Sequence, residues 1–186
     1  MEELSTIPTP CTTKIEALRD SIAQIIVGQT QATDLLLTSV IARGHVLIEG
    51  VPGVAKTLLA RVMAQLIDAR FSRVQFTPDL MPSDVLGTTV YNMKTGDFDF
   101  HPGPVFADVV LADEINRAPA KTQAALFEVM EERQVTVDGT PRAMSDVFTI
   151  IATQNPVEQE GTYKLPEAQL DRFLMKITMD YPTTDE

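Results

Sequence analysis

Residues 50–57 have the composition of a loop that holds phosphate groups. They follow a short apolar run at residues 45–48 and open a segment whose apolar residues recur at helical spacing. Backbone N–H groups of such a glycine-rich turn point into one cavity, and the start of the following helix adds positive potential. The ammonium group of Lys56 can then reach the β- and γ-phosphates of a nucleotide, while the hydroxyl of Thr57 ligates Mg²⁺. The residues expected to contact the nucleotide are Gly50, Pro52, Gly53, Val54, Ala55, Lys56, Thr57 and Leu58.

The loop departs from the usual pattern at one position, because Ala55 stands where a glycine commonly precedes the lysine. Alanine costs little there if its backbone φ angle stays negative, since glycine is required only where φ is positive. We therefore expect a negative φ at Ala55 and a loop that still binds phosphate. The alternative is a chance glycine-rich turn, which an isolated match would leave open.

Two adjacent carboxylates end a second apolar run. Asp113 and Glu114 follow residues 109–112, which read as a buried strand. Asp113 can hold Mg²⁺ through the water shell of the ion, and Glu114 can activate the attacking water because neighbouring strand side chains point in different directions. A solvated turn is the alternative for such a pair. Their place on a separate strand of the same alternating unit as Lys56 favours the catalytic interpretation.

A third apolar run, at residues 147–152, ends in Thr153-Gln154-Asn155-Pro156. The amide of Asn155 at that strand end can orient the water that attacks the γ-phosphate. Asparagine before proline also suits a simple turn. The residues alone leave both interpretations open.

Helical and strand patterns alternate along the chain. Thr13 and Glu16 have the form of a capping box, and the helix that they begin ends at Gly28. Further helices are expected at 31–42, 56–69, 119–133 and 167–172, and further strands at 72–76 and 173–178. Alternation of this kind predicts an α/β fold with a parallel sheet that helices cover on both faces. Residues 87–104 and 134–146 interrupt the alternation and read as inserted hairpins, the second with an Asp-Gly turn.

Composition limits the classes of protein to which the chain can belong. Its 186 residues suit one domain, with residues 1–12 as a flexible lead-in and 13–186 as a nucleotide-binding core. The 15 basic and 26 acidic residues give a net charge of −11, which disfavours nonspecific binding to nucleic acid. Cys11 is the single cysteine, so an internal disulfide and a cysteine-based metal cage are excluded. No membrane span or signal peptide is visible, and a cytoplasmic location is expected.

The motifs together resemble a MoxR-type AAA+ ATPase, and the resemblance covers nearly the whole chain after residue 12. It is carried by residues 26–29, the loop at 50–57, and the runs 113–118, 153–156 and 170–173. Residues 158–170 are especially distinctive, although Lys164 stands where relatives usually carry proline. The resemblance implies a P-loop NTPase fold: a three-layer αβα sandwich with a parallel five-stranded sheet and two hairpin inserts.

The resemblance also implies roles for individual residues. Val27 and Gly28 would lie against the adenine ring, and Asn155 would be the sensor of the γ-phosphate. Arg172 would be the arginine finger that reaches ATP on a neighbouring subunit, where a cation stabilises the charge that develops during transfer. From the residues alone, an ion pair of Arg172 with Asp171 or Glu167 would be the expected role.

ATP with Mg²⁺, a hexameric ring and a partner of the von Willebrand factor A type are likewise implied by the resemblance. The implied work is chaperone-like remodelling of partner proteins or assembly of metal centres. The hairpins would face the pore of the ring, where Tyr91, Phe98 and Phe100 would either touch a substrate or pack onto the domain, and we favour packing.

Two other functions are kept as alternatives. One is a nucleotide-gated scaffold with little hydrolysis, which the presence of Glu114 disfavours. The other is a DNA-working AAA+ motor, which the net acidity disfavours. Relatives usually continue into a small helical lid that closes over the nucleotide, and we expect this sequence to lack it, because only four residues follow Pro182.

Overall fold

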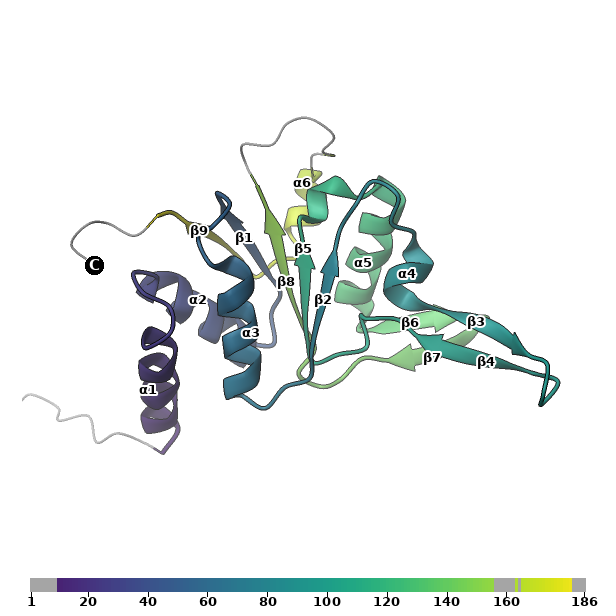
Figure 1. Ribbon diagram of the computed structural model, residues 1–186, viewed down its shortest axis with the longest axis horizontal. Helices are drawn as coiled ribbons and strands as arrows, with labels where there is room; N and C mark the ends of the chain where they lie inside the picture. Colours follow the sequence, from purple (N-terminus) through teal and green to yellow (C-terminus); the bar gives the residue numbers. More distant parts are fainter. Residues whose placement is uncertain (1–9, 156–162, 164, 182–186) are drawn as a thin grey trace, which may run out of the picture.

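The computed structural model describes residues 10–155, 163 and 165–181, and its centre is a five-stranded sheet (Figure 1). The strand order is β2-β5-β8-β1-β9, and the four neighbouring pairs are all parallel. The strands are β1 (Val46–Gly50), β2 (Phe71–Gln75), β5 (Val109–Asp113), β8 (Thr149–Gln154) and β9 (Met175–Met179). The predicted α/β fold with a parallel five-stranded sheet is confirmed.

Helices cover both faces of this sheet, as Figure 1 shows. On one side lie α1 (Pro10–Ala23), α2 (Thr30–Ile41) and α3 (Lys56–Leu66), and on the other lie α4 (Pro82–Leu86) and α5 (Ala120–Glu132). Val109 and Leu111 of β5 belong to the hydrophobic cluster on the α3 side, whereas Val110 and Ala112 belong to the cluster on the α5 side. A strand buried on both faces must be apolar throughout, which accounts for the unbroken apolar runs in the sequence.

Helix boundaries differ from the predicted ones by a few residues. The helix α1 begins at Pro10 rather than at Thr13, so residues 10–12, predicted as lead-in, are helical. Proline suits the first turn of a helix because its missing N–H would be unsatisfied there in any case. The sequence also failed to predict α4 and a 3₁₀ helix, η1 (Ile115–Arg117), which are too short to show a periodic pattern. The helix α6 (Glu167–Leu170) ends before Arg172, and Lys164 and most of the distinctive stretch before it lie outside the described residues.

The two predicted hairpin inserts are confirmed as β3 (Gly87–Asn92) with β4 (Asp97–Pro102), and β6 (Gln134–Val137) with β7 (Thr140–Ala143). They extend side by side away from the sheet (Figure 1). The guanidinium group of Arg142 on β7 lies 3.9 Å from the ring centroid of Phe100 on β4, so a cation–π contact joins the two hairpins.

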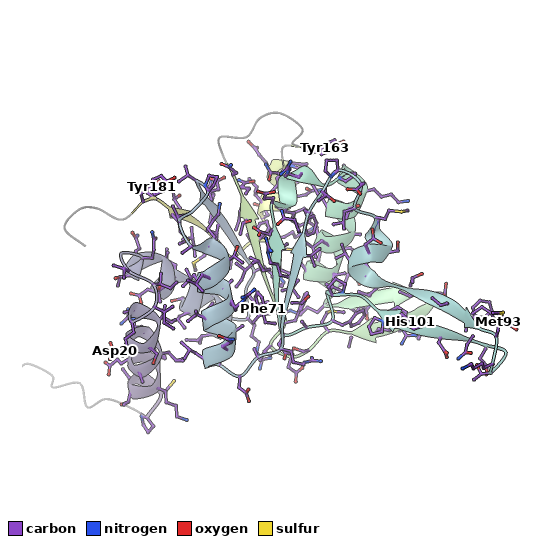
Figure 2. All side chains as sticks on the ribbon, in the orientation of Figure 1. Asp20, Phe71, Met93, His101, Tyr163 and Tyr181 are labelled. Carbon is purple, nitrogen blue, oxygen red and sulfur yellow. The ribbon has the colours of Figure 1, made fainter. Side chains whose placement is uncertain are left out.

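Aromatic residues of the first hairpin divide into two groups. Phe100 packs edge-on against Phe106, with 5.7 Å between ring centroids, which agrees with the packing role that we favour. Tyr91 and Phe98 lie 5.2 Å apart and contact each other, yet 72% of Phe98 is exposed. Met93 lies at the far tip of the hairpin (Figure 2). The prediction that this surface faces a pore remains untested.

The buried His45, directly before β1, forms contacts with β8 and α5. The Nδ1 atom of His45 accepts a hydrogen bond of 2.9 Å from the N–H of Ile150, so the ring proton is on Nε2, which donates to the carbonyl of Met130 at 3.1 Å. The ring also packs edge-on against Phe148. Burial lowers the pKa of His45 from 6.5 to about 4, because a charged ring would lose its hydration. The neutral ring therefore links the start of β1 to β8 and α5.

The lowered pKa of His45 predicts a loss of stability in weak acid. A group whose pKa is lower in the folded state contributes stability above its unfolded value of 6.5, and this stability is lost as the pH falls toward 4. The full contribution is about 3 kcal/mol, at about 1.4 kcal/mol per pKa unit. Urea denaturation of the wild type and of His45→Gln at pH 7.5 and 5.5 measures it, and the drop should be smaller in His45→Gln. The exposed His101→Gln is the control and should retain the wild-type drop; an equal drop in His45→Gln would refute the prediction.

Candidate nucleotide-binding site

The carboxyl ends of three neighbouring strands lie at one edge of the sheet. Since β8 pairs in parallel with both β1 and β5, the segments that follow these three strands emerge at the same edge of the sheet. Ligands of open α/β sheets bind at this edge. A cleft of about 360 Å³ lies here, lined by Pro52, Gly53, Ala55, Lys56, Thr57, Leu58, Asp113, Glu114 and Asn155. The structure thus brings together the three motifs that the sequence singled out.

The phosphate loop leads directly into α3, which begins at Lys56. The N–H groups in the first turn of a helix have no carbonyl partner within the helix, and the first turn of α3 lines the cleft, where an anion could accept from them. Gly53 has a φ of 89°, a conformation that glycine adopts without strain. The ammonium group of Lys56 donates to the carbonyl of Gly50, which holds the side chain across the loop.

Two residues predicted to bind the nucleotide support the loop instead of lining the main cleft. A Cβ atom on Gly50 would lie 2.4 Å from the carbonyl oxygen of Met179 on β9, so only glycine fits where the two strands approach. Val54 is buried in the hydrophobic cluster on the α3 side. Both residues fix the course of the loop, and whether they also touch a nucleotide remains untested.

The expectation for the backbone of Ala55 was wrong. Its φ angle is 63°, in the left-handed region, rather than negative. The turn from the loop into α3 needs this conformation, which is why glycine is usual at this position. For alanine the left-handed conformation costs about 1–2 kcal/mol, because Cβ approaches the following carbonyl oxygen. The loop therefore keeps its usual conformation, with backbone strain at Ala55.

Asp113 is the best-connected residue of the cleft and only 8% exposed. Its Oδ1 atom accepts a hydrogen bond of 2.6 Å from the hydroxyl of Thr153. Its Oδ2 atom lies 3.4 Å from the hydroxyl of Thr57 and accepts two hydrogen bonds from Arg73, at 2.7 and 3.1 Å. The residues Thr57 and Asp113, predicted as metal ligands, are therefore adjacent.

These two residues form an open set of oxygen ligands. Among the residues that the structure describes, no group of three or more His, Cys, Asp or Glu side chains converges as a closed metal site. Magnesium usually binds through one or two protein ligands and keeps its other positions for water and phosphate oxygens. One hydroxyl and one carboxylate beside a phosphate loop fit that requirement.

Glu114 does not continue the predicted strand alternation. Its φ of 56° places it in a left-handed turn that ends β5 and begins η1. Its carboxylate accepts hydrogen bonds from Gln75 at 2.8 Å and from Arg117 at 3.0 Å, while its N–H donates to the hydroxyl of Thr153 at 2.9 Å. Thr153 therefore positions both carboxylates, which the sequence did not predict.

The two remaining catalytic candidates lie in different places. Asn155 follows β8, is buried and lines the cleft. Arg172 does not line the cleft, and its guanidinium forms an ion pair of 2.6 Å with Glu131 of α5. Asp171 and Glu167 were predicted as ion-pair partners of Arg172, and this prediction was wrong. Because α6 ends before Arg172, the side chain points toward α5 instead.

Val27 and Gly28, the residues predicted to contact adenine, line two hollows beside the phosphate loop. Val27, which is 60% exposed, lines a small hollow of about 110 Å³ with Ile25, Ile26, Gln29, Gly53, Val54, Ala55 and Leu58. Gly28 lines a neighbouring, larger hollow that also contains Tyr181. The Tyr181 hydroxyl, at the edge of the molecule in Figure 2, donates to the carbonyl of Pro52 at 3.1 Å. An exposed apolar surface beside the phosphate loop suits a flat base.

The site combines a phosphate loop after β1, the amide of Asn155 after the adjacent strand β8, and two carboxylates at the end of β5. These features define a P-loop nucleotide-binding protein. A model of the ATPase family associated with various cellular activities (AAA) matches residues 45–175. The match covers well over half of the chain, so the chain belongs to this family.

Individual relatives confirm the resemblance to MoxR-type AAA+ proteins. The chain is 55% identical to the uncharacterised protein YeaC of Bacillus subtilis over 90% of its length, and 53% identical to the chaperone MoxR1 of Mycobacterium tuberculosis over 89%. A solved structure of a protein described as an ATPase from Cytophaga hutchinsonii shares 50% identity, with a TM-score of 0.83 over 93% of this chain. The chain spans about half the length of these proteins: 52%, 44% and 52%, respectively.

Membrane-spanning segments were also sought. In the part of the chain that the structure describes, no helix is both long and apolar enough to cross a membrane.

The strain at Ala55 makes a prediction for stability. Replacing Ala55 with glycine removes the left-handed penalty, although glycine gains entropy in the unfolded chain. The net effect should be a stabilisation of about 0.5–1 kcal/mol, or a rise in Tm of a few degrees. Differential scanning calorimetry checks it. Ala124→Gly, on the exposed face of α5, is the matched control and should lower stability by about 1 kcal/mol; a lower Tm in Ala55→Gly would contradict the assignment of strain.

Proposed function

We propose that this protein binds ATP together with Mg²⁺ and hydrolyses ATP to ADP and phosphate. The observation that carries the proposal is the convergence of Lys56, Thr57, Asp113, Glu114 and Asn155 on one cleft at the carboxyl edge of the sheet. Family membership supports it, since the family is one of ATPases. The two hollows beside Val27 and Gly28 would receive the base.

Binding depends on compensation of the phosphate charge. The backbone N–H groups at the start of α3 donate to phosphate oxygens, and Lys56 places a positive charge beside the β- and γ-phosphates. Thr57 and Asp113 hold Mg²⁺, which supplies further positive charge to the phosphates when it is bound.

Hydrolysis requires a base and an oriented water. In our proposal Glu114 accepts a proton as the water oxygen attacks the γ-phosphorus and the bond to the β-phosphate oxygen breaks, with ADP as the leaving group. The amide of Asn155 orients that water. Gln75 and Arg117 both donate to the Oε2 atom of Glu114, so Oε1 is the oxygen that would accept the proton.

Arg172 completes the site from a second subunit. Its place outside the cleft of its own chain and on the surface beside α5 supports action on the nucleotide of a neighbour. A hexameric ring is the assembly that we propose. In it the protein would remodel partner proteins in chaperone-like fashion or assist metal-centre assembly, with a von Willebrand factor A-type protein as partner. A cytoplasmic location stays a prediction.

Separation of binding from turnover tests the assignment of the site. Lys56→Ala should weaken ATP binding at least about tenfold, because it removes the cation from a site of several negative charges. Glu114→Gln should bind ATP normally yet hydrolyse it about 100-fold or more slowly, since an amide cannot accept the proton. Calorimetry and phosphate release measure the two effects. Tight binding by Lys56→Ala, or near-normal turnover by Glu114→Gln, would show that the site is assigned wrongly.

Mixed oligomers test the proposed role of Arg172. Alone, Arg172→Ala should bind ATP normally and hydrolyse it about 1,000-fold more slowly, a loss typical of arginine fingers. Mixed with Glu114→Gln protein, it should regain part of its activity, because some interfaces pair an intact Glu114 with an intact Arg172 of the neighbour. Phosphate release by mixtures whose assembly has been verified gives the answer. Activity that stays at the level of the separate variants would exclude an arginine that acts between subunits.

A further inference from the structure

Arg73 of β2 contacts the carboxylate to which the proposed function assigns Mg²⁺. Its Nη2 and Nε atoms donate to the Oδ2 atom of Asp113 at 2.7 and 3.1 Å, and Nη2 also donates to the side chain of Gln75 at 2.8 Å. The Asp113 side chain is 11% exposed and that of Arg73 is 44% exposed. A nearly buried carboxylate is thus neutralised by a cation that reaches in from the surface.

The sheet register places these groups on one face. β2 pairs in parallel with β5, with Arg73 opposite Leu111 and Gln75 opposite Asp113. Leu111 packs on the α3 side of the sheet, and strand side chains alternate, so Asp113 lies on the same side, as do Arg73 and Gln75. This is the side on which the phosphate loop enters α3. The guanidinium group therefore lies on the α3 side of the sheet, beside Asp113, rather than on the far face.

The two oxygen atoms of Asp113 have different surroundings. Oδ1 accepts the short hydrogen bond from Thr153, which fixes the carboxylate plane. Oδ2 faces Thr57, the other predicted metal ligand, at 3.4 Å. A metal shared by Thr57 and Asp113 must therefore approach Oδ2, the atom that Arg73 already contacts.

We infer that Arg73 is a positioning residue that competes with Mg²⁺ for the Oδ2 atom of Asp113. Without metal, Arg73 supplies the positive charge that a buried carboxylate requires. A dication at Oδ2 is repelled by the guanidinium, so metal binding and withdrawal of Arg73 occur together. Arg73 can withdraw because nearly half of its side chain is exposed, whereas Asp113 is held by Thr153.

Competition of this kind weakens metal binding in the wild type, which distinguishes it from a merely structural ion pair. The residues directly before the same two strands provide a matched structural pair. Arg70 forms an ion pair of 2.9 Å with Asp108, at the opposite end of β5 from the cleft. Its loss should affect stability but leave the metal site unchanged.

The inference rests on the proposed function, and its test uses Mn²⁺ as a probe for Mg²⁺. Mn²⁺ binding to the protein with saturating ADP is followed by the electron paramagnetic resonance signal of free Mn²⁺. Arg73→Gln should bind Mn²⁺ about 5- to 50-fold more tightly than wild type, the range typical of coupling between neighbouring sites. Arg73→Lys, which keeps the charge but loses the paired donors, should fall between the two. Arg70→Gln should match the wild type.

A second readout is the Tm in EDTA. Both Arg73→Gln and Arg70→Gln should melt below the wild type, because each leaves a carboxylate without its cation, but only the first should change Mn²⁺ affinity. Unchanged or weaker Mn²⁺ binding in Arg73→Gln overturns the inference. If that variant does not fold, Arg73→Lys decides, and an affinity no higher than wild type overturns it. A wild type that binds no ADP would instead refute the proposed function, and the inference with it.

Discussion

Burial of one carboxylate is the constraint on which the cleft depends. Asp113 ends a strand that is apolar on both faces, and a charge at such a position must be fully hydrogen-bonded to be tolerated. Thr153 and Arg73 provide those hydrogen bonds from the strands on either side. The same hydroxyl of Thr153 accepts the N–H of Glu114 and so fixes the turn that separates the two carboxylates. The polar contacts that make burial possible also fix the relative positions of the two carboxylates, to which we assign the roles of metal ligand and base.

That arrangement is possible only because the strands are parallel and in a fixed order. β8 lies between β1 and β5, so the residues that follow each strand meet at one edge. At the opposite edge, the neutral ring of His45 links the start of β1 to Ile150 of β8 and Met130 of α5. The same strands are thus joined by side-chain contacts at both of their ends.

Much of the fold and most of the cleft could be predicted because the important residues lie at the end of an apolar strand or within a few residues of it. Lys56, Asp113 and Asn155 needed no more than strand positions and the alternation of helices to be placed together. Arg73 could not be recognised, since its role depends on β2 lying next to β5, and strand order is not a local property. Neither could the pairing of Arg172 with Glu131, which lies far away in sequence.

Local backbone conformation was harder to predict still. The left-handed φ angles of Ala55 and Glu114 belong to turns that the surrounding sheet imposes, whereas residue type alone favours negative values. The helix α4 has only five residues and no apolar period, so its existence follows from the packing of Val85 into the core. In each case the local sequence does not identify the tertiary contact that compensates the energetic cost of the local conformation.

The contact between Arg142 and Phe100 joins the two hairpins into one extended projection. β4 leads through residues 103–108 into β5, and β7 leads through 144–148 into β8, so each hairpin continues into a strand that carries part of the cleft at its other end. This projection extends well beyond the sheet (Figure 1), and it joins the sheet where β5 and β8 begin. The strands that lead to Asp113 and Asn155 are therefore connected, at their other ends, to one joined projection with Met93 at its tip.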